Sequence, residues 1–332
     1  MRHTRCFILL LCAVQLLLPC SAGTSDWEMQ MGLPELTCPA FFQQVGDQCL
    51  FFSFMGPSNF KSAKQFCVGL QASLVIINSA TQFENILIYI RTHGYESSSF
   101  WVDGSNVKNE TVWVDSNKDL VVMNTPFWLA SETVHKPSTE DATNCIALED
   151  QYGFFMNNVD CEGLHSALCE YPLPTGVEES VDEENASVEC PPFFVDVGGT
   201  CLAFVIWENV AWEDANIPCI GMEGELAILN NIQQLRDIYE YLHKHEIHQH
   251  SFWIGGSDKE AEGLWVWNDD TNITMDSPWW GYSSDGDKWV PEPTGAEGEN
   301  CLALTSEGEH YLRDKVCSEL FSPLCMISTK YL

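Results

Sequence analysis

A cluster of oxygen-bearing side chains near the end of the chain has the residue types of a cation site. Its members are Glu292, Pro293, Thr294, Glu299 and Asp314. Three carboxylates and a proline held close to two cysteines could form an oxygen cage for a hard cation such as Ca²⁺. The sequence therefore predicts a candidate Ca²⁺ site with Glu292, Glu299 and Asp314 as its ligands.

An earlier copy of this stretch keeps the proline and both cysteines but has none of the three carboxylates. Its corresponding residues are Lys136, Pro137, Ser138, Thr143, Asn157 and Asn158. Lys136 also adds a positive charge, which disfavours a cation. We expect no Ca²⁺ in this first copy and assign it a structural role or Ca²⁺-independent binding.

Twelve cysteines beyond residue 22 divide the chain into two repeats. They are Cys38, Cys49, Cys67, Cys145, Cys161 and Cys169, then Cys190, Cys201, Cys219, Cys301, Cys317 and Cys325. Successive gaps are 11, 18, 78, 16 and 8 residues in the first set and 11, 18, 82, 16 and 8 in the second. This agreement indicates a tandem duplication. An even number of cysteines in an oxidising compartment favours disulfides, although sequence alone leaves many pairings open.

Two helices and several short strands must position the loops of each repeat. Apolar residues at helical spacing predict helices at 63–70, 83–91, 211–222 and 232–242. Aromatic-rich strands follow around Trp101, Trp113, Trp253 and Trp265, whose indoles we expect in the core. Trp279, Trp280 and Trp289 lie beside the candidate site, so they could either pack in the core or form part of the site. The fold class is α+β.

The ends and the charge of the chain restrict its partners. Residues 1–22 have the charged, apolar, small-residue order of a cleaved signal peptide, with a signal anchor as the alternative. An N-terminal segment covers 23–37, and the acidic stretch 172–189 reads as a solvated linker between domains at 38–171 and 190–328. The net charge of −33 repels nucleic acid and anionic lipid. We expect a secreted protein without a membrane span.

Other motifs offer weaker chemistry. The run His243–His250 holds four histidines that could bind Zn²⁺ or Cu²⁺, but it lacks the spacing of a metalloprotease motif and is better explained as the polar end of a helix. No catalytic triad is recognisable, so an enzyme is not expected. Asn109, Asn185 and Asn272 begin glycosylation sequons, which we interpret as surface decoration.

Each repeat resembles a long-form C-type lectin domain, and the pair resembles the secreted two-domain lectins of invertebrate innate immunity. The cysteine pattern, the related segments Phe100–Ser105 and Phe252–Ser257, and the proline loops carry this resemblance. It implies two helices, short antiparallel strands, a long-loop region and three disulfides per domain. The implied pairs are Cys38–Cys49, Cys67–Cys169, Cys145–Cys161, Cys190–Cys201, Cys219–Cys325 and Cys301–Cys317.

The resemblance also implies a sugar site. In that family a Glu-Pro-Asn type triplet with a cis proline, a later Glu and a Trp-Asn-Asp segment hold one Ca²⁺, which two sugar hydroxyls also bind. Glu292 at the first position implies a mannose-type preference, while Thr294 and Arg313 depart from the pattern. A guanidinium cannot bind a cation. Arg313 turned inward would pair with Glu292 or Glu299 as an internal counter-ion; turned outward, it would leave a weak Ca²⁺ site.

These observations predict a secreted pattern-recognition lectin that binds glycans, microbial ones above all, mainly through the second domain. Its expected contacts are Glu292, Pro293, Thr294, Glu299 and Asp314. The alternative is a Ca²⁺-independent protein-interaction module that has lost the sugar site. Protein partners or a homo-oligomer remain compatible with either function.

Overall fold

The computed structural model describes residues 37–53, 55–106, 112–131, 134–138, 144–173, 188–275, 278–285, 288–295 and 298–327. The predicted signal peptide, nearly all of the N-terminal segment, most of the linker, Thr143, Asn109 and Asn185 lie outside these ranges. Both repeats belong to a single compact unit that starts at Thr37.

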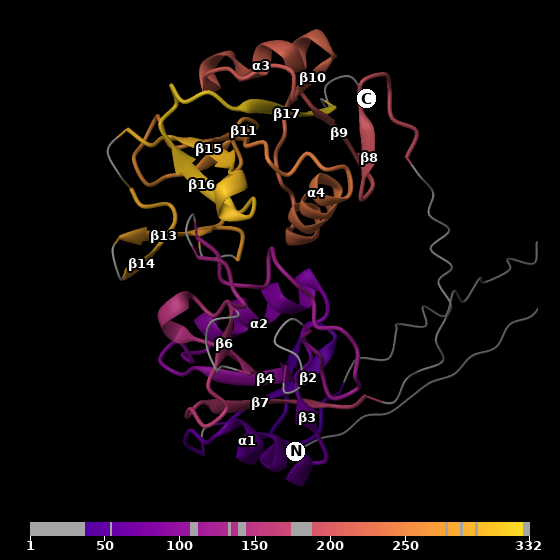
Figure 1. Cartoon of the computed structure of the whole chain (residues 1–332), viewed down its shortest axis with the longest axis vertical. Coiled ribbons are helices and arrows are strands. Elements are labelled where there is room, and N and C mark those ends of the chain that lie inside the picture. Colours follow the sequence, from indigo (N-terminus) through magenta and orange to yellow (C-terminus); the bar gives the residue numbers. More distant parts are fainter. Residues whose placement is uncertain are drawn as a thin grey trace, which may run out of the picture. The chain divides into compact units, whose positions relative to one another are not determined.

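The first domain is built on one twisted sheet with two helices (Figure 1). Its helices are α1 (Phe60–Gly69) and α2 (Ala80–Thr92), with a short 3₁₀ helix at Asp150–Tyr152. Its strands are β1 (Gln43–Val45), β2 (Gln48–Phe52), β3 (Ser73–Leu74), β4 (Phe100–Ser105), β5 (Cys145–Leu148), β6 (Met156–Val159) and β7 (Ser166–Tyr171). The sheet order is β1-β2-β7-β4-β5-β6, with β3 also on β7.

The second domain repeats this plan. Its helices are α3 (Trp212–Gly221) and α4 (Ile232–Lys244), with a 3₁₀ helix at Ser306–Gly308. Its strands are β8 (Val195–Val197), β9 (Thr200–Phe204), β10 (Gly224–Leu226), β11 (Phe252–Ser257), β12 (Val266–Trp267), β13 (Tyr282–Asp285), β14 (Lys288–Pro291), β15 (Cys301–Leu304), β16 (Leu312–Lys315) and β17 (Ser322–Ile327). The main sheet runs β16-β15-β11-β17-β9-β8, and β13 and β14 form a separate hairpin.

One pairing in each domain differs from the antiparallel arrangement that the resemblance implied. Strand β4 runs parallel to β7, and β11 runs parallel to β17, while the other paired strands are antiparallel. These parallel pairs join the start of the loop-rich half to the last strand of the domain. They therefore fix the base from which the long loops and the candidate site project.

Local sequence explains where the helices begin. Side-chain oxygens of Asn59, Ser79 and Asn231 accept hydrogen bonds from backbone N–H groups three residues on, which satisfies donors that a helix start leaves unpaired. Helix α2 then buries Phe83 and Ile86 on one face. The predicted helices are thus all present, and α1 and α2 each begin three residues earlier than expected, directly after their capping residues Asn59 and Ser79.

The expected core tryptophans are buried. Trp101 and Trp253 have no exposed surface, and their indole N–H groups donate to the carbonyl oxygens of Ser58 and Val210 at 2.7 and 2.8 Å. Trp113 and Trp265 are also buried. Because each buried indole N–H needs an acceptor, these equivalent hydrogen bonds hold the same helix-to-strand connection in each domain.

Six disulfides staple the two domains, and they are the pairs that the resemblance implied. They join Cys38–Cys49, Cys67–Cys169, Cys145–Cys161, Cys190–Cys201, Cys219–Cys325 and Cys301–Cys317. The third pair of each domain ties the strand that follows the proline loop to a cysteine three residues after Asp314 or Asn158, so it connects the two segments that supply the site residues.

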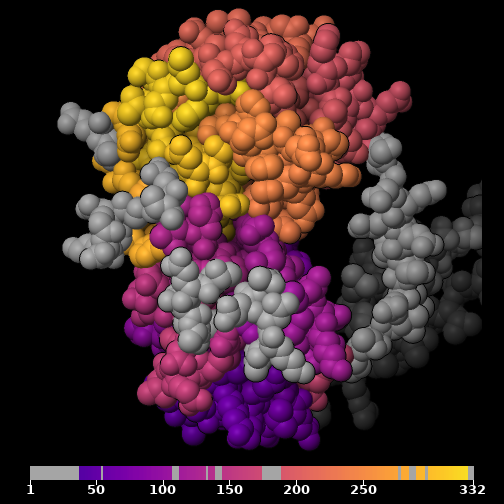
Figure 2. Space-filling model, in the orientation of Figure 1, coloured from indigo at the N-terminus to yellow at the C-terminus, as the bar shows by residue number. Residues whose placement is uncertain are grey.

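The two domains contact each other directly. Helix α2 packs on α4, and side chains of the two domains meet in the space-filling view (Figure 2). The Tyr311 hydroxyl donates to the Trp128 carbonyl at 2.8 Å, and the Trp279 indole donates to Glu84 at 2.8 Å. These contacts bury polar groups with their partners and are typical of an ordered interface.

Candidate functional site

The candidate site of the second domain begins where β14 ends. Glu292 follows Pro291, is 5% exposed, and donates its backbone N–H to the Gly281 carbonyl at 3.0 Å. The Glu292–Pro293 peptide is cis, as the resemblance implied. The Glu292 side chain is buried in the domain rather than placed at the surface.

The structure brings the four predicted polar residues together around Thr294. Its backbone N–H lies 3.1 Å from Glu292 Oε2 and 3.3 Å from Asp314 Oδ1. Its hydroxyl donates toward Glu299 Oε2 at 3.3 Å and lies 3.5 Å from Asp314 Oδ2. Glu292 and Asp314 are buried, whereas Thr294 is exposed and Glu299 is half-buried. Only the Thr294 and Glu299 side of the cluster faces solvent.

Arg313 is turned inward and is fully buried. Its Nη1 lies 3.3 Å from Glu292 Oε1 and 3.1 Å from Ser283 Oγ, and its Nη2 donates to the Tyr282 carbonyl. Of the two orientations that the sequence left open, this is the one in which Arg313 acts as an internal counter-ion of Glu292. Planar guanidinium groups suit such buried ion pairs.

A glycine makes room for this arginine. A Cβ atom on Gly308 would lie 2.2 Å from Arg313 Nε, closer than real Cβ contacts allow, and one on Gly281 would lie 3.3 Å away. Sequence reasoning missed Gly308, Gly281 and Ser283 as parts of the site. No signal in the chain links them to Arg313, because Gly281 and Ser283 lie just before and within β13, Gly308 ends a 3₁₀ helix, and the fold alone brings them to Arg313.

The burial of this cluster changes its proton affinity. Burial, followed by the neighbouring Asp314 carboxyl, raises the pKa of Glu292 to about 8. One guanidinium and two carboxylates would leave a net negative charge in the interior, and a single proton held by Glu292 removes it. Partial burial and the Asp314 charge also raise the pKa of Glu299.

This arrangement does not fit a Ca²⁺ ion. Ca²⁺ requires six to eight oxygen ligands, whereas Glu292 already engages Arg313 and Ser283 through one oxygen and Thr294 through the other. A buried guanidinium beside the same carboxylate would also repel the ion. Across the parts of the chain that the structure describes, no group of three His, Cys, Asp or Glu residues is arranged to hold a metal.

The corresponding site of the first domain keeps the same backbone frame without carboxylates. The Lys136–Pro137 peptide is cis, and Ser138 exchanges two hydrogen bonds with the Asn158 amide at 3.1 and 3.2 Å. Asn157 is buried and donates to Glu149. Asn158 thus holds Ser138 as Asp314 holds Thr294, and the loop is closed by neutral groups.

Comparison with known proteins decides the family. The sequence model of the family named lectin C-type domain matches residues 56–171 and 208–327. The chain belongs to the C-type lectin domain family. It is 28% identical over 140 residues to the galactose-specific lectin nattectin of Thalassophryne nattereri, covering 42% of this chain and 81% of nattectin.

Two further relatives show how much of each protein is shared. Lymphocyte antigen 75 of Mesocricetus auratus is 22% identical over 262 residues, covering 75% of this C-type lectin chain and 14% of the relative. The mouse scavenger receptor C-type lectin carbohydrate-recognition domain is 25% identical, with a TM-score of 0.31, covering 41% of this chain and 94% of that one. This chain therefore spans most of nattectin and a small part of lymphocyte antigen 75.

The histidine run and the predicted lack of a membrane span can also be compared with the structure of this lectin. The histidine run begins in the last turn of α4 and is largely exposed, with the His243 ring stacked on His248 at 4.5 Å. It therefore forms the polar helix end that the sequence favoured. Within the described ranges, no helix is both long and apolar enough to cross a membrane.

Proposed function

We propose that this lectin is a secreted glycan-binding protein of host defence that uses its second domain and does not need Ca²⁺. One observation carries the second part: the buried Arg313 guanidinium pairs with Glu292 at 3.3 Å. A permanent positive charge is thus built into the place where the family resemblance implies a metal ion. The name of nattectin, a galactose-specific lectin, supports the carbohydrate part.

The solvent-facing edge of the cluster has the groups that a sugar needs. Thr294 offers a hydroxyl that both donates and accepts, and Glu299 offers carboxylate oxygens that accept from sugar hydroxyls. Hydrogen bonds to a charged group contribute about 1.5–3 kcal/mol each. Two or three such bonds give weak binding by one site, so we expect dense microbial glycans to be held better than free sugars.

The mannose-type preference does not carry over to this proposal. In the resemblance, that preference depends on two hydroxyls that complete a Ca²⁺ shell beside the first Glu of the triplet. Here Glu292 is buried behind Thr294 and committed to Arg313. Sugar choice would instead depend on the hydrogen bonds made by Thr294 and Glu299.

The test is binding of the full chain to immobilised galactose, mannose and N-acetylglucosamine polymers, measured in Ca²⁺ and in EDTA. We expect equal binding in both buffers to at least one polymer, and loss of that binding in Glu299→Gln. The matched control is Glu246→Gln, an exposed acid after α4. Binding abolished by EDTA would overturn the Ca²⁺-independent proposal. Absence of binding to every polymer would favour the protein-interaction alternative.

A further inference from the structure

A cavity of about 340 Å³ lies between the two domains, against the sequon that begins at Asn272. The first domain contributes Glu84 and Ile88 from α2 to its lining, and the second contributes Trp267 and Trp279. A volume of this size lies within the range of small-molecule sites, about 300–1,000 Å³. Asn272 itself lines the cavity and is exposed to solvent.

The backbone holds the sequon in place. Asn272 forms a β-bridge with Val266, and the buried Ile273 donates its N–H to the Trp265 carbonyl at 2.9 Å. With Ile273 fixed in the core, its neighbours Asn272 and Thr274 are held at the surface. The acceptor amide therefore has a defined position at the cavity rather than a place on a free loop tip.

The lining has the chemistry of a saccharide seat. Trp267 and Trp279, which are 5% and 8% exposed, supply small areas of aromatic surface that the apolar face of a sugar ring can contact. Amides, a carboxylate and hydroxyls supply hydrogen-bond groups of both kinds; they come from Asn230, Asn231, Glu84, Thr271 and Thr274. Such a mixture matches a neutral sugar better than it matches a charged or purely apolar ligand.

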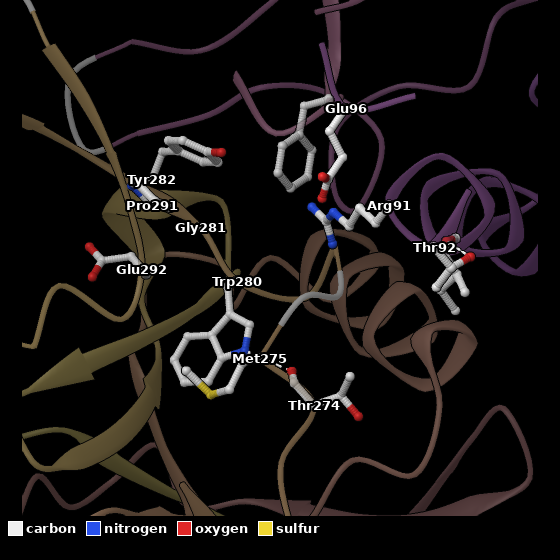
Figure 3. A pocket seen from close by; sticks show the side chains of 12 residues that line it. Arg91, Thr92, Glu96, Thr274, Met275, Trp280, Gly281, Tyr282, Pro291 and Glu292 are labelled. Atoms are coloured by element: carbon white, nitrogen blue, oxygen red, sulfur yellow. Dashed lines mark hydrogen bonds between the residues drawn. The ribbon is translucent and has the colours of Figure 1, made fainter. Parts of the chain in front are cut away.

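A second cavity of about 560 Å³ continues the first. The two share Ile88 and Thr274, so the sequon stands where they join. Figure 3 shows Arg91 and Glu96 of the first domain on one side of this larger cavity, and Thr274, Met275 and Trp280 of the second domain on another. Together the cavities form a groove along the contact between the domains, which we call the interdomain groove.

We propose that Asn272 carries an N-linked glycan whose first sugars lie in the interdomain groove and connect α2 of the first domain to the second domain. The Asn272 amide nitrogen forms a bond to the anomeric carbon of a lipid-linked diphosphate oligosaccharide. The lipid diphosphate leaves with the anomeric oxygen, and the amide loses one proton. This inference rests on the secretion proposed above.

The first domain has no counterpart of this glycan. Leu120 lies 53 residues after Cys67, as Asn272 lies 53 residues after Cys219, and Leu120 is 76% exposed. Of these two equivalent positions, only the one in the second domain can therefore carry an N-linked glycan. A glycan attached to Asn272 of the second domain thus connects the two domains, in contrast to the surface decoration that the sequence suggested.

The test compares release of individual glycans from the full chain secreted by animal cells. The native protein is treated with a peptide N-glycosidase in ¹⁸O water, and labelled aspartate at each sequon is quantified by peptide mass spectrometry. We expect the glycan on Asn272 to be released more slowly than that on Asn109 by about tenfold or more. A tenfold difference corresponds to a binding free energy of about 1.4 kcal/mol between the glycan and the groove. After denaturation the two rates should become equal.

Three results would overturn the inference. Asn272 without glycan, while Asn109 or Asn185 carries one, would contradict it and leave secretion intact. Glycan on Asn272 that is released as fast as that on Asn109 would show that the groove does not hold it. Glycan on none of the three sequons would overturn this inference together with secretion.

A second measurement tests whether the Asn272 glycan stabilises the contact between the domains or serves only to keep the protein soluble. In hydrogen exchange of Asn272→Gln, amides at the C-terminal end of α2 that face the groove should exchange faster than in the unaltered chain. Asn109→Gln, which removes a sequon of the first domain, is the matched control and should leave these amides unchanged. Equal exchange in both variants would contradict the inference.

Discussion

Phe155 and Tyr311 occupy equivalent positions in the two domains, and their rings meet edge to face with centroids 5.4 Å apart. Each lies ten residues after the first cysteine of its third disulfide. Contact between equivalent residues is the mark of a self-complementary interface, like that of a twofold dimer. The duplicated domains therefore pack through the same face.

The surrounding contacts follow the same approximate symmetry. Glu84 and Arg236 are equivalent, since each lies 17 residues after the third cysteine of its domain. Glu84 accepts from the Trp279 indole, and the Arg236 guanidinium lies 5.4 Å from the centre of the Phe127 ring. Arg236 also donates to the Met123 and Thr125 carbonyls, at 2.8 and 2.7 Å. Opposite charges at equivalent positions distinguish the two sides of the contact.

Removal of the central ring should destabilise both domains. Phe155→Ala deletes a buried aromatic side chain, and such deletions cost about 3–5 kcal/mol of the free energy of unfolding. Chemical denaturation followed by tryptophan fluorescence would measure the loss. The control is Phe41→Ala, because Phe41 is 76% exposed and its loss should have little effect. Equal midpoints for the two variants would mean that the domains do not depend on this contact.

Sequence alone predicted the repeats, the helices and the group of side chains at the site, but it could not predict the state of that site. The direction of Arg313 depends on Ser283, which is 30 residues away, and on the space left by Gly308. Neither relation produces a periodic pattern. The parallel pairing of β4 with β7 was also not predicted, because short strands carry no signal of their order in a sheet.

The buried charge cluster should tolerate loss of its carboxyl better than loss of its guanidinium. Arg313→Met leaves an unbalanced negative charge in the interior, and breaking such a pair costs about 3–5 kcal/mol. Glu292→Gln resembles the protonated carboxyl and should cost about 1 kcal/mol. Urea unfolding of both variants measures the difference. Similar losses for the two would show that Glu292 is ionised beside Arg313.

Calcium affinity provides a direct test of what Arg313 does. We expect no binding heat when the full chain is titrated with Ca²⁺, because the guanidinium and its partners occupy the carboxylate oxygens. Arg313→Asn replaces the cation with an oxygen ligand and should bind Ca²⁺ with a dissociation constant of about 10⁻⁴–10⁻³ M, the range of extracellular modules. Binding by the unaltered chain would show that Arg313 does not close the site.

The proton held by Glu292 should make the second domain less stable as pH rises. The folded pKa of about 8 lies above the usual 4.5, so the folded state keeps a proton that the unfolded state has released between these values. The stability gained from this proton is complete below pH 4.5 and is lost as pH approaches 8, by at most about 1.4 kcal/mol per pH unit. Glu292→Gln has no such proton, so its unfolding free energy should fall less over the same window. Parallel pH profiles for the variant and the unaltered chain would exclude Glu292 as the group that titrates.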